Sequence, residues 1–164
     1  MTLQQWLDQS HHQSREVQDR VRLAIDFLQR HYGVAHAERV LSEIQCIDFS
    51  QPVELPAIPA RTILVGSKDR RDSPSRTVYF TKSEHSIDGL GVAASGPART
   101  NPKVLDEVPH RYEVLVPIPS GEALQSMCAP DADTWSVEGR KLLAAGGGHQ
   151  FLIPNMNRYL RFMA

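Results

Sequence analysis

The eleven prolines of this 164-residue chain all lie beyond residue 51. Proline has no backbone N–H and a fixed φ angle, so it is disfavoured in helix interiors and in central strands. Residues 1–45 contain no proline and a single glycine, Gly33, which is the composition expected of helices. Residues 46–164 hold every proline and the other nine glycines, as expected of short strands joined by turns. The chain therefore divides near residue 45.

The N-terminal region shows the helical period in three stretches. Thr2 and Gln5 match a capping box at the start of a short amphipathic segment. A longer helix, for which Ser10 and Gln13 are candidate caps, should follow and end at the glycine. A third helix is expected over about 35–45. The apolar positions of the longer helix recur every three or four residues, at Val17, Val21, Ala24, Ile25 and Leu28.

The C-terminal region carries short apolar or alternating runs, which are typical of strands in a β core. These runs lie at 62–65, 77–81, 112–116 and 151–153. The polar stretch 88–109 is expected to be a loop. The predicted fold class is α+β, as a single domain over 1–164. In it, a helical segment over residues 1–45 packs on a β-rich core, residues 46–164, that carries the site.

Composition restricts the class of function. With 41% hydrophobic and 23% charged residues the chain is globular, and a net charge of −1 argues against a nucleic-acid partner. No apolar run approaches the ~20 residues of a membrane span, and no signal segment opens the chain. The histidines have no cysteine partners at zinc spacing, so no metal is expected. The two cysteines are interpreted as reduced, buried thiols, with a disulfide between them as the alternative, and reduced thiols suit action in a cytoplasm.

A glycine run, Gly146 to Gly148, precedes His149 and Gln150 and then a short apolar strand. Glycines allow positive φ angles and let a ligand lie against bare backbone. Gln150 is therefore expected at the end of a strand, beside space that only glycine leaves open. A plain glycine-rich turn between strands is the alternative.

Six short segments take this interpretation further. In their order they resemble the C-terminal toxin domains of interbacterial effectors, notably the NAD(P)+ glycohydrolase toxins delivered by type VI secretion. More distantly, the Gly-Gly-Gly-x-Gln element is similar to that of tuberculosis necrotizing toxin, an NAD glycohydrolase on an ADP-ribosyltransferase-like fold. The segments are 46–54, 76–81, 90–92, 124–126, 133–136 and 146–150.

The resemblance implies an ADP-ribosyltransferase-like β core that hydrolyses NAD+ or NADP+ to nicotinamide and ADP-ribose or its phosphate. The dinucleotide is then the substrate, and no cofactor is expected. A cognate immunity protein is the implied partner. Secretion by a specialised system and action in the cytoplasm of a target cell are the implied localisation, without membrane insertion by this domain.

The resemblance also places Gln150 at the catalytic position, where ADP-ribosyltransferases usually carry glutamate. An amide keeps one acceptor and two donors, but it takes no proton at neutral pH. Gln150 is therefore expected to hold the nicotinamide ribose while the bond to the cationic leaving group breaks, and water traps the electron-poor carbon. Hydrolysis is favoured, with mono-ADP-ribosylation of a macromolecule or a non-catalytic interaction module as alternatives.

Other residues are candidates for substrate binding. Arg61 begins a basic run suited to a diphosphate, or to a solvated surface loop. Tyr79 and Phe80 face opposite sides of a strand, and one ring is expected to stack on the nicotinamide, unless both only pack. Trp135, in a turn-like polar neighbourhood, would line the cleft or fix a loop. The remaining candidates are Ser126, Gly147 and Gly148.

Overall fold

The structure is a computed structural model that describes residues 1–66, 79–82, 110–129, 131–137, 140–144 and 148–163. Three helices come first: α1 (Leu3–Ser10), α2 (Arg15–Tyr32) and α3 (Ala37–Ile44). Eight described strands follow, and the short helix α4 (Met156–Tyr159) precedes the last of them. The strands are β1 (Ile63–Gly66), β2 (Tyr79–Lys82), β3 (His110–Val114), β4 (Leu124–Met127), β5 (Asp131–Val137), β6 (Arg140–Ala144), β7 (His149–Leu152) and β8 (Leu160–Met163).

The helix ends follow local sequence signals. The Thr2 hydroxyl accepts from the Gln5 backbone and the Gln5 side chain accepts from the Thr2 backbone, which confirms the predicted capping box. Gly33 ends α2 with a φ of 91°, as predicted. The cap of α2 is Ser14 rather than Ser10 or Gln13, since Ser14 accepts from a backbone N–H of the first turn. Ser10 instead belongs to α1.

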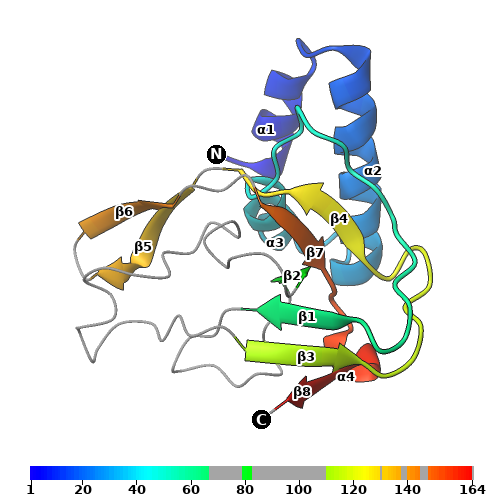
Figure 1. Ribbon diagram of the computed structural model, residues 1–164. Coiled ribbons are helices and arrows are strands. Elements are labelled where there is room, and N and C mark those ends of the chain that lie inside the picture. The colour runs from blue at the N-terminus through cyan, green and yellow to red at the C-terminus, as the bar shows by residue number, and fades with distance from the viewer. Residues whose placement is uncertain (67–78, 83–109, 130, 138–139, 145–147, 164) are drawn as a thin grey trace.

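Six strands form one antiparallel sheet in the order β4-β7-β2-β1-β3-β8, and β5 pairs with β6 in a separate ribbon (Figure 1). Strands β1, β3 and β7 lie within about two residues of their predicted positions. The strand predicted at 77–81 corresponds to β2, which is described over Tyr79–Lys82. The loop predicted at 88–109 lies outside the described residues. The strands β4, β5, β6 and β8 were not predicted. None of the described helices is long and apolar enough to cross a membrane.

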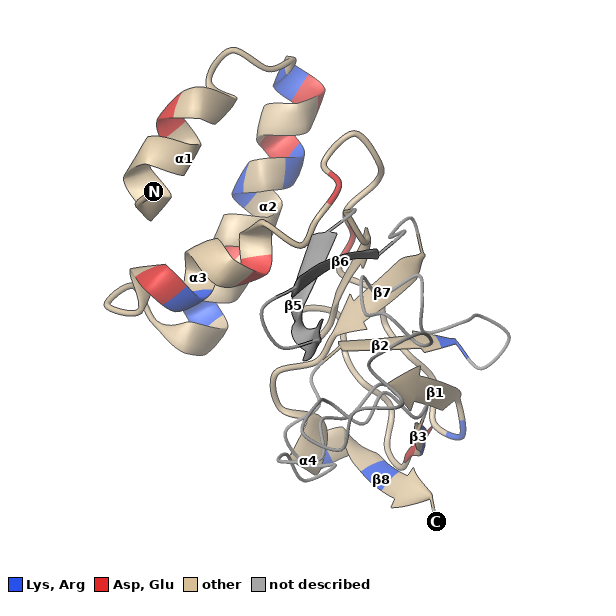
Figure 2. Ribbon diagram, turned by 90° about the vertical axis from the view of Figure 1, so that its left-hand side faces the viewer, with Lys and Arg blue, Asp and Glu red and all other residues tan. Residues whose placement is uncertain are grey.

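The two faces of the sheet bury different cores. On one face, Leu124 and Leu152 join a cluster made otherwise by the three N-terminal helices and the segment after them. Figure 2 shows those helices together on one side of the strands. On the other face, Phe80, Phe151 and Tyr112 pack with residues around α4. The predicted α+β class, with N-terminal helices packed on a sheet, is confirmed.

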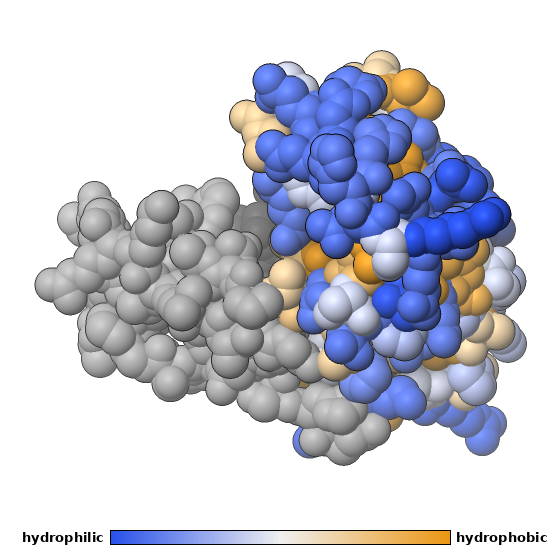
Figure 3. Space-filling model, turned by 90° about the horizontal axis from the view of Figure 1, so that it is seen from above, coloured by the Kyte–Doolittle hydropathy of each residue, from blue (hydrophilic) through white to orange (hydrophobic). Residues whose placement is uncertain are grey.

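The side of the molecule seen from above shows no large apolar area over the described residues. There the described residues are mainly hydrophilic, and apolar side chains form small separate patches (Figure 3). Such scattered apolar side chains are ordinary for a folded protein. Over the described residues, this side of the molecule therefore shows no extended apolar surface.

Candidate functional site

Gln150 lies on β7 and is held by two hydrogen bonds. Its Nε2 donates to the hydroxyl of Ser126, 3.0 Å away on the neighbouring strand β4, and to the backbone carbonyl of Cys46 at 3.1 Å. A carbonyl oxygen can only accept, so the nitrogen of the amide, not its oxygen, faces Cys46. Both amide hydrogens are therefore committed to the protein, and Oε1 is the group left to act on a ligand.

The position of Gln150 differs from the expectation of an open strand end. Its side chain is 1% exposed and is among the largest fully buried side chains described. The burial follows from the topology, because β7 lies between β4 and β2 and the residues after α3 run against β4. Gln150 lies near the start of β7, as predicted for the end of a strand, but its side chain is enclosed by the protein. The catalytic role of Gln150 stays a prediction.

The glycines before Gln150 are described only at Gly148. Gly148 is half-buried, and its carbonyl accepts from the backbone N–H of Cys128 at 2.9 Å, as in a strand. Positive φ angles occur at Gly33 and Gly121 among the described glycines, so the left-handed backbone expected here is not found at Gly148. Gly147 lies outside the described residues.

A row of residues, one from each strand, crosses the sheet on the helix-facing side and includes Gln150. We call it the Gln150 row. The strand registers pair Ser126 with Gln150 at one end, and pair the other four members successively. Gln150 and Thr81, where the two parts of the row meet, lie on the same face of the sheet. Leu152 pairs with Tyr79, and every second side chain of a strand points to the same face. The members are Ser126, Gln150, Thr81, Val65, Arg111 and Met163.

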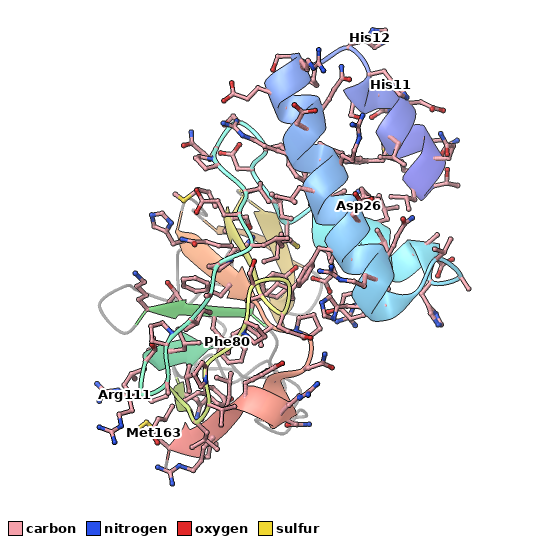
Figure 4. The ribbon with its side chains drawn as sticks, turned by 90° about the vertical axis from the view of Figure 1, so that its right-hand side faces the viewer. His11, His12, Asp26, Phe80, Arg111 and Met163 are labelled. Atoms are coloured by element: carbon pink, nitrogen blue, oxygen red, sulfur yellow. The ribbon has the colours of Figure 1, made fainter. Side chains whose placement is uncertain are left out.

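The environment changes along this row. Ser126, Gln150, Thr81 and Val65 are buried, with exposed fractions of 6% or less. Arg111 is exposed, and Figure 4 places it with Met163 at the end of the sheet farthest from the three N-terminal helices. The row therefore runs from a polar, buried pair beneath the helices to a cation at the surface.

Tyr79 makes a second polar contact between the sheet and α3. Its hydroxyl donates to Oε2 of Glu43, whose other carboxylate oxygen lies 2.9 Å from Nε of Arg39. Burial, and then the negative charge of Glu43, raise the pKa of Tyr79 well above its ordinary value. The same two causes raise the pKa of Tyr32. Tyr79 is thus a neutral hydroxyl that orients α3, and its ring packs toward the helices.

The other predicted residues lie apart from Gln150. Phe80 is completely buried on the opposite face, edge-on to Tyr112 with ring centroids 5.1 Å apart, which favours the packing alternative. Figure 4 shows Phe80 within the body of the sheet. Arg61 is exposed before β1 begins, with a φ of 69°, whereas the Gln150 row crosses that strand at Val65. Trp135 lies in strand β5 and not in a turn, which corrects that prediction.

Two residues near Gln150 were not predicted. Glu43 is 6% exposed although it is charged, and a sequence signal existed, because it falls three positions after Val40, on the apolar face of α3. Thr81 is 1% exposed, but threonine is common in strands, so nothing in the sequence marks it. Within the described residues, no group of histidine, cysteine and acidic side chains is suited to hold a metal ion.

Comparison with known proteins gives one strong structural likeness. No protein-family model and no curated protein sequence matches the chain. The fold resembles that of Tse6. The structure of Tse6 in complex with Tsi6 matches with a TM-score of 0.68 and 16% identity, over 93% of this chain and 99% of the matched chain. Rhs1-CT in complex with its cognate immunity protein RhsI1 gives a TM-score of 0.43 and 16% identity, over 70% and 78%.

Proposed function

We propose that the protein hydrolyses NAD+ or NADP+ to nicotinamide and ADP-ribose or its phosphate. The proposal is carried by the meeting of segments that are far apart in the sequence. Cys46, Ser126 and Gln150 come from three of the segments that resemble NAD(P)+ glycohydrolase toxins, and they are joined by hydrogen bonds at one point. A fourth segment supplies Tyr79 on the same face of the sheet.

The geometry suggests how Gln150 acts. Since Nε2 is fixed by Cys46 and Ser126, the amide cannot rotate without losing two hydrogen bonds. Oε1 is thereby preorganised to accept a hydrogen bond from a hydroxyl of the nicotinamide ribose. The nicotinamide ring of the dinucleotide is cationic and becomes neutral when its bond to the ribose breaks, so its departure needs no proton from the protein. Water then attacks the electron-poor ribose carbon and loses its extra proton to the solvent, so Gln150 is required to orient the ribose rather than to exchange a proton.

The same proposal makes the chain a toxin. Cleavage of the dinucleotide pool would stop redox metabolism in a bacterial cytoplasm, which suits an effector secreted by a specialised system into a target cell. A cell that makes such a protein needs an inhibitor, so we propose a cognate immunity protein as partner. The solved complex of Tse6 with Tsi6, a protein of similar fold with a bound partner, supports this expectation.

The deciding experiment mixes the purified protein with NAD+ and, separately, with NADP+ and quantifies nicotinamide by chromatography. We expect release from at least one dinucleotide. Folded protein that cleaves neither would overturn the proposal. Labelled NAD+ added to a target-cell lysate separates the alternatives, since transfer would label a macromolecule and hydrolysis would label free ADP-ribose. Expression in a bacterial cytoplasm without growth arrest would favour a non-catalytic module.

A further inference from the structure

Thr81 is buried without a hydrogen-bond partner. Its residue is 1% exposed, and among the described residues its Oγ1 finds no donor or acceptor. Buried polar side-chain atoms are rarely left unsatisfied, because the lost hydration is not replaced. An unsatisfied hydroxyl inside a sheet therefore calls for an explanation, such as a ligand that satisfies it.

The place of Thr81 on the sheet indicates which ligand. Strands β2 and β7 pair at Tyr79 with Leu152 and at Phe80 with Phe151. The same antiparallel register, continued along both strands, brings Thr81 opposite Gln150. Thr81 and Gln150 face the same side of the sheet, because each lies two residues from the paired Tyr79 and Leu152. The described pairing of β2 with β7 ends one residue before this position. The unsatisfied hydroxyl is thus the neighbour of the residue assigned to the ribose.

We propose that Thr81 is a substrate-binding residue, whose hydroxyl binds the second of the two vicinal hydroxyls of the nicotinamide ribose. This inference rests on the proposed function. A cis-diol presents two hydroxyls side by side, and the strand register places two polar residues, Gln150 and Thr81, opposite one another on the same face of the sheet. The amide oxygen can only accept, whereas the threonine hydroxyl can both donate and accept. The two residues together therefore select a ribose with both hydroxyls present.

The competing explanation is that Thr81 is a strand residue with an unused hydroxyl. Both explanations predict that Thr81→Val, which replaces the hydroxyl by a methyl group of similar shape, makes the unliganded protein more stable. They differ in substrate binding. A structural threonine leaves KM unchanged, whereas a ribose-binding threonine gives a variant that is more stable and yet binds more weakly.

The experiment compares Thr81→Val, Thr81→Ser and the control Thr62→Val for melting temperature without ligand and for KM and kcat with the preferred dinucleotide. Thr62 lies before β1, off the Gln150 row, and its hydroxyl donates to the Pro59 carbonyl at 2.7 Å. We expect Thr81→Val to raise the melting temperature and to raise KM roughly five- to tenfold, the effect of one hydrogen bond. Thr81→Ser should restore KM, and Thr62→Val should lower the melting temperature with KM unchanged.

An unchanged KM for Thr81→Val, with active wild-type enzyme, overturns the assignment of Thr81 and leaves the proposed function intact. Failure of Thr81→Val to fold also overturns it, because the hydroxyl would then serve the protein itself. Wild-type protein that cleaves neither dinucleotide overturns the proposed function and the role of Thr81 with it. A substrate analogue that lacks one ribose hydroxyl gives an independent test. Its KM should respond less to Thr81→Val than that of the complete dinucleotide.

Discussion

The side chain of Gln150 donates a hydrogen bond to the backbone carbonyl of Cys46, a residue 104 positions earlier in the chain. This contact joins β7 to the segment that follows α3, so the helical region of the chain fixes the orientation of the residue that the resemblance predicts to be catalytic. The helices thus belong to the candidate site and are not only a cover for the core. Changes at either end of the contact should affect both stability and activity.

Gln150→Leu tests this double role. The leucine keeps most of the volume, but it leaves the Cys46 carbonyl without that donor, so we expect a loss of about 1–3 kcal/mol in the free energy of unfolding. Nicotinamide release should fall about 10²–10³-fold, the usual effect of removing a group aimed at the transition state. Urea unfolding and the chromatographic assay measure the two effects. The matched control is Gln125→Leu, on the adjacent strand and the opposite face, which should leave turnover intact.

Gln150→Glu should make stability depend on pH. A carboxylate oxygen would face the Cys46 carbonyl, acceptor against acceptor, in a buried place, so the pKa of the introduced carboxyl should rise above its unfolded value of about 4.3. A raised folded-state pKa means that the variant is best tolerated at acid pH and loses stability as the pH rises through it. Melting temperatures of variant and wild type between pH 4.5 and pH 8 would show a widening gap. A gap independent of pH would contradict the burial of this side chain.

Tyr79 should make the wild-type protein sensitive to alkali. Its folded-state pKa lies well above the ordinary value of about 10, mainly because of burial and then because of Glu43. Below pH 10 both folded and unfolded states keep the proton. As the pH rises further, the unfolded state loses it first, so the free energy of unfolding falls. Urea unfolding between pH 8 and pH 11 should show this decline, and Tyr79→Phe should make it shallower.

The contact between Tyr79 and Glu43 should appear as an energetic coupling. In a double-mutant cycle of Tyr79→Phe and Glu43→Leu, we expect a coupling of about 1–3 kcal/mol, as for a buried hydrogen bond to a charged group. The control cycle pairs Glu43→Leu with Tyr159→Phe, because Tyr159 packs in the cluster on the other face of the sheet. That pair should be additive within about 0.5 kcal/mol. Equal coupling in both cycles would contradict a specific contact.

Elements with local determinants were predictable from the sequence. The caps at Thr2 and Gly33 depend on neighbouring residues only, and the apolar period of α2 extends over 18 residues. Strands of four residues, such as β4 and β8, are too short for a period to stand out. Their existence depends on partners far away in the chain, namely β7 and β3. For that reason the class of the fold was accessible and the strand order was not.

The site divides in the same way. The sequence indicated Gln150 and Ser126 as residues of interest, and the fold brings them to 3.0 Å of one another. Their burial was not predictable, because the end of α3 that meets them is set by tertiary packing. Phe80 and Tyr79 were predicted to face opposite sides, which is confirmed, but which core each ring enters depends on the layer of helices. Thr81 stands out only through its unsatisfied hydroxyl, which no pattern of residue types records.

The place of β7 in the sheet bears on when the protein can become active. In space β7 lies between β4 and β2, although it follows both in the chain. A growing polypeptide that ends before Leu152 therefore lacks the strand that carries Gln150 and joins the two halves of the sheet. Pairing between distant segments also slows folding, since the intervening chain must close into loops first. The residues of the candidate site consequently come together only after β7 has been made and has paired with strands that precede it in the chain.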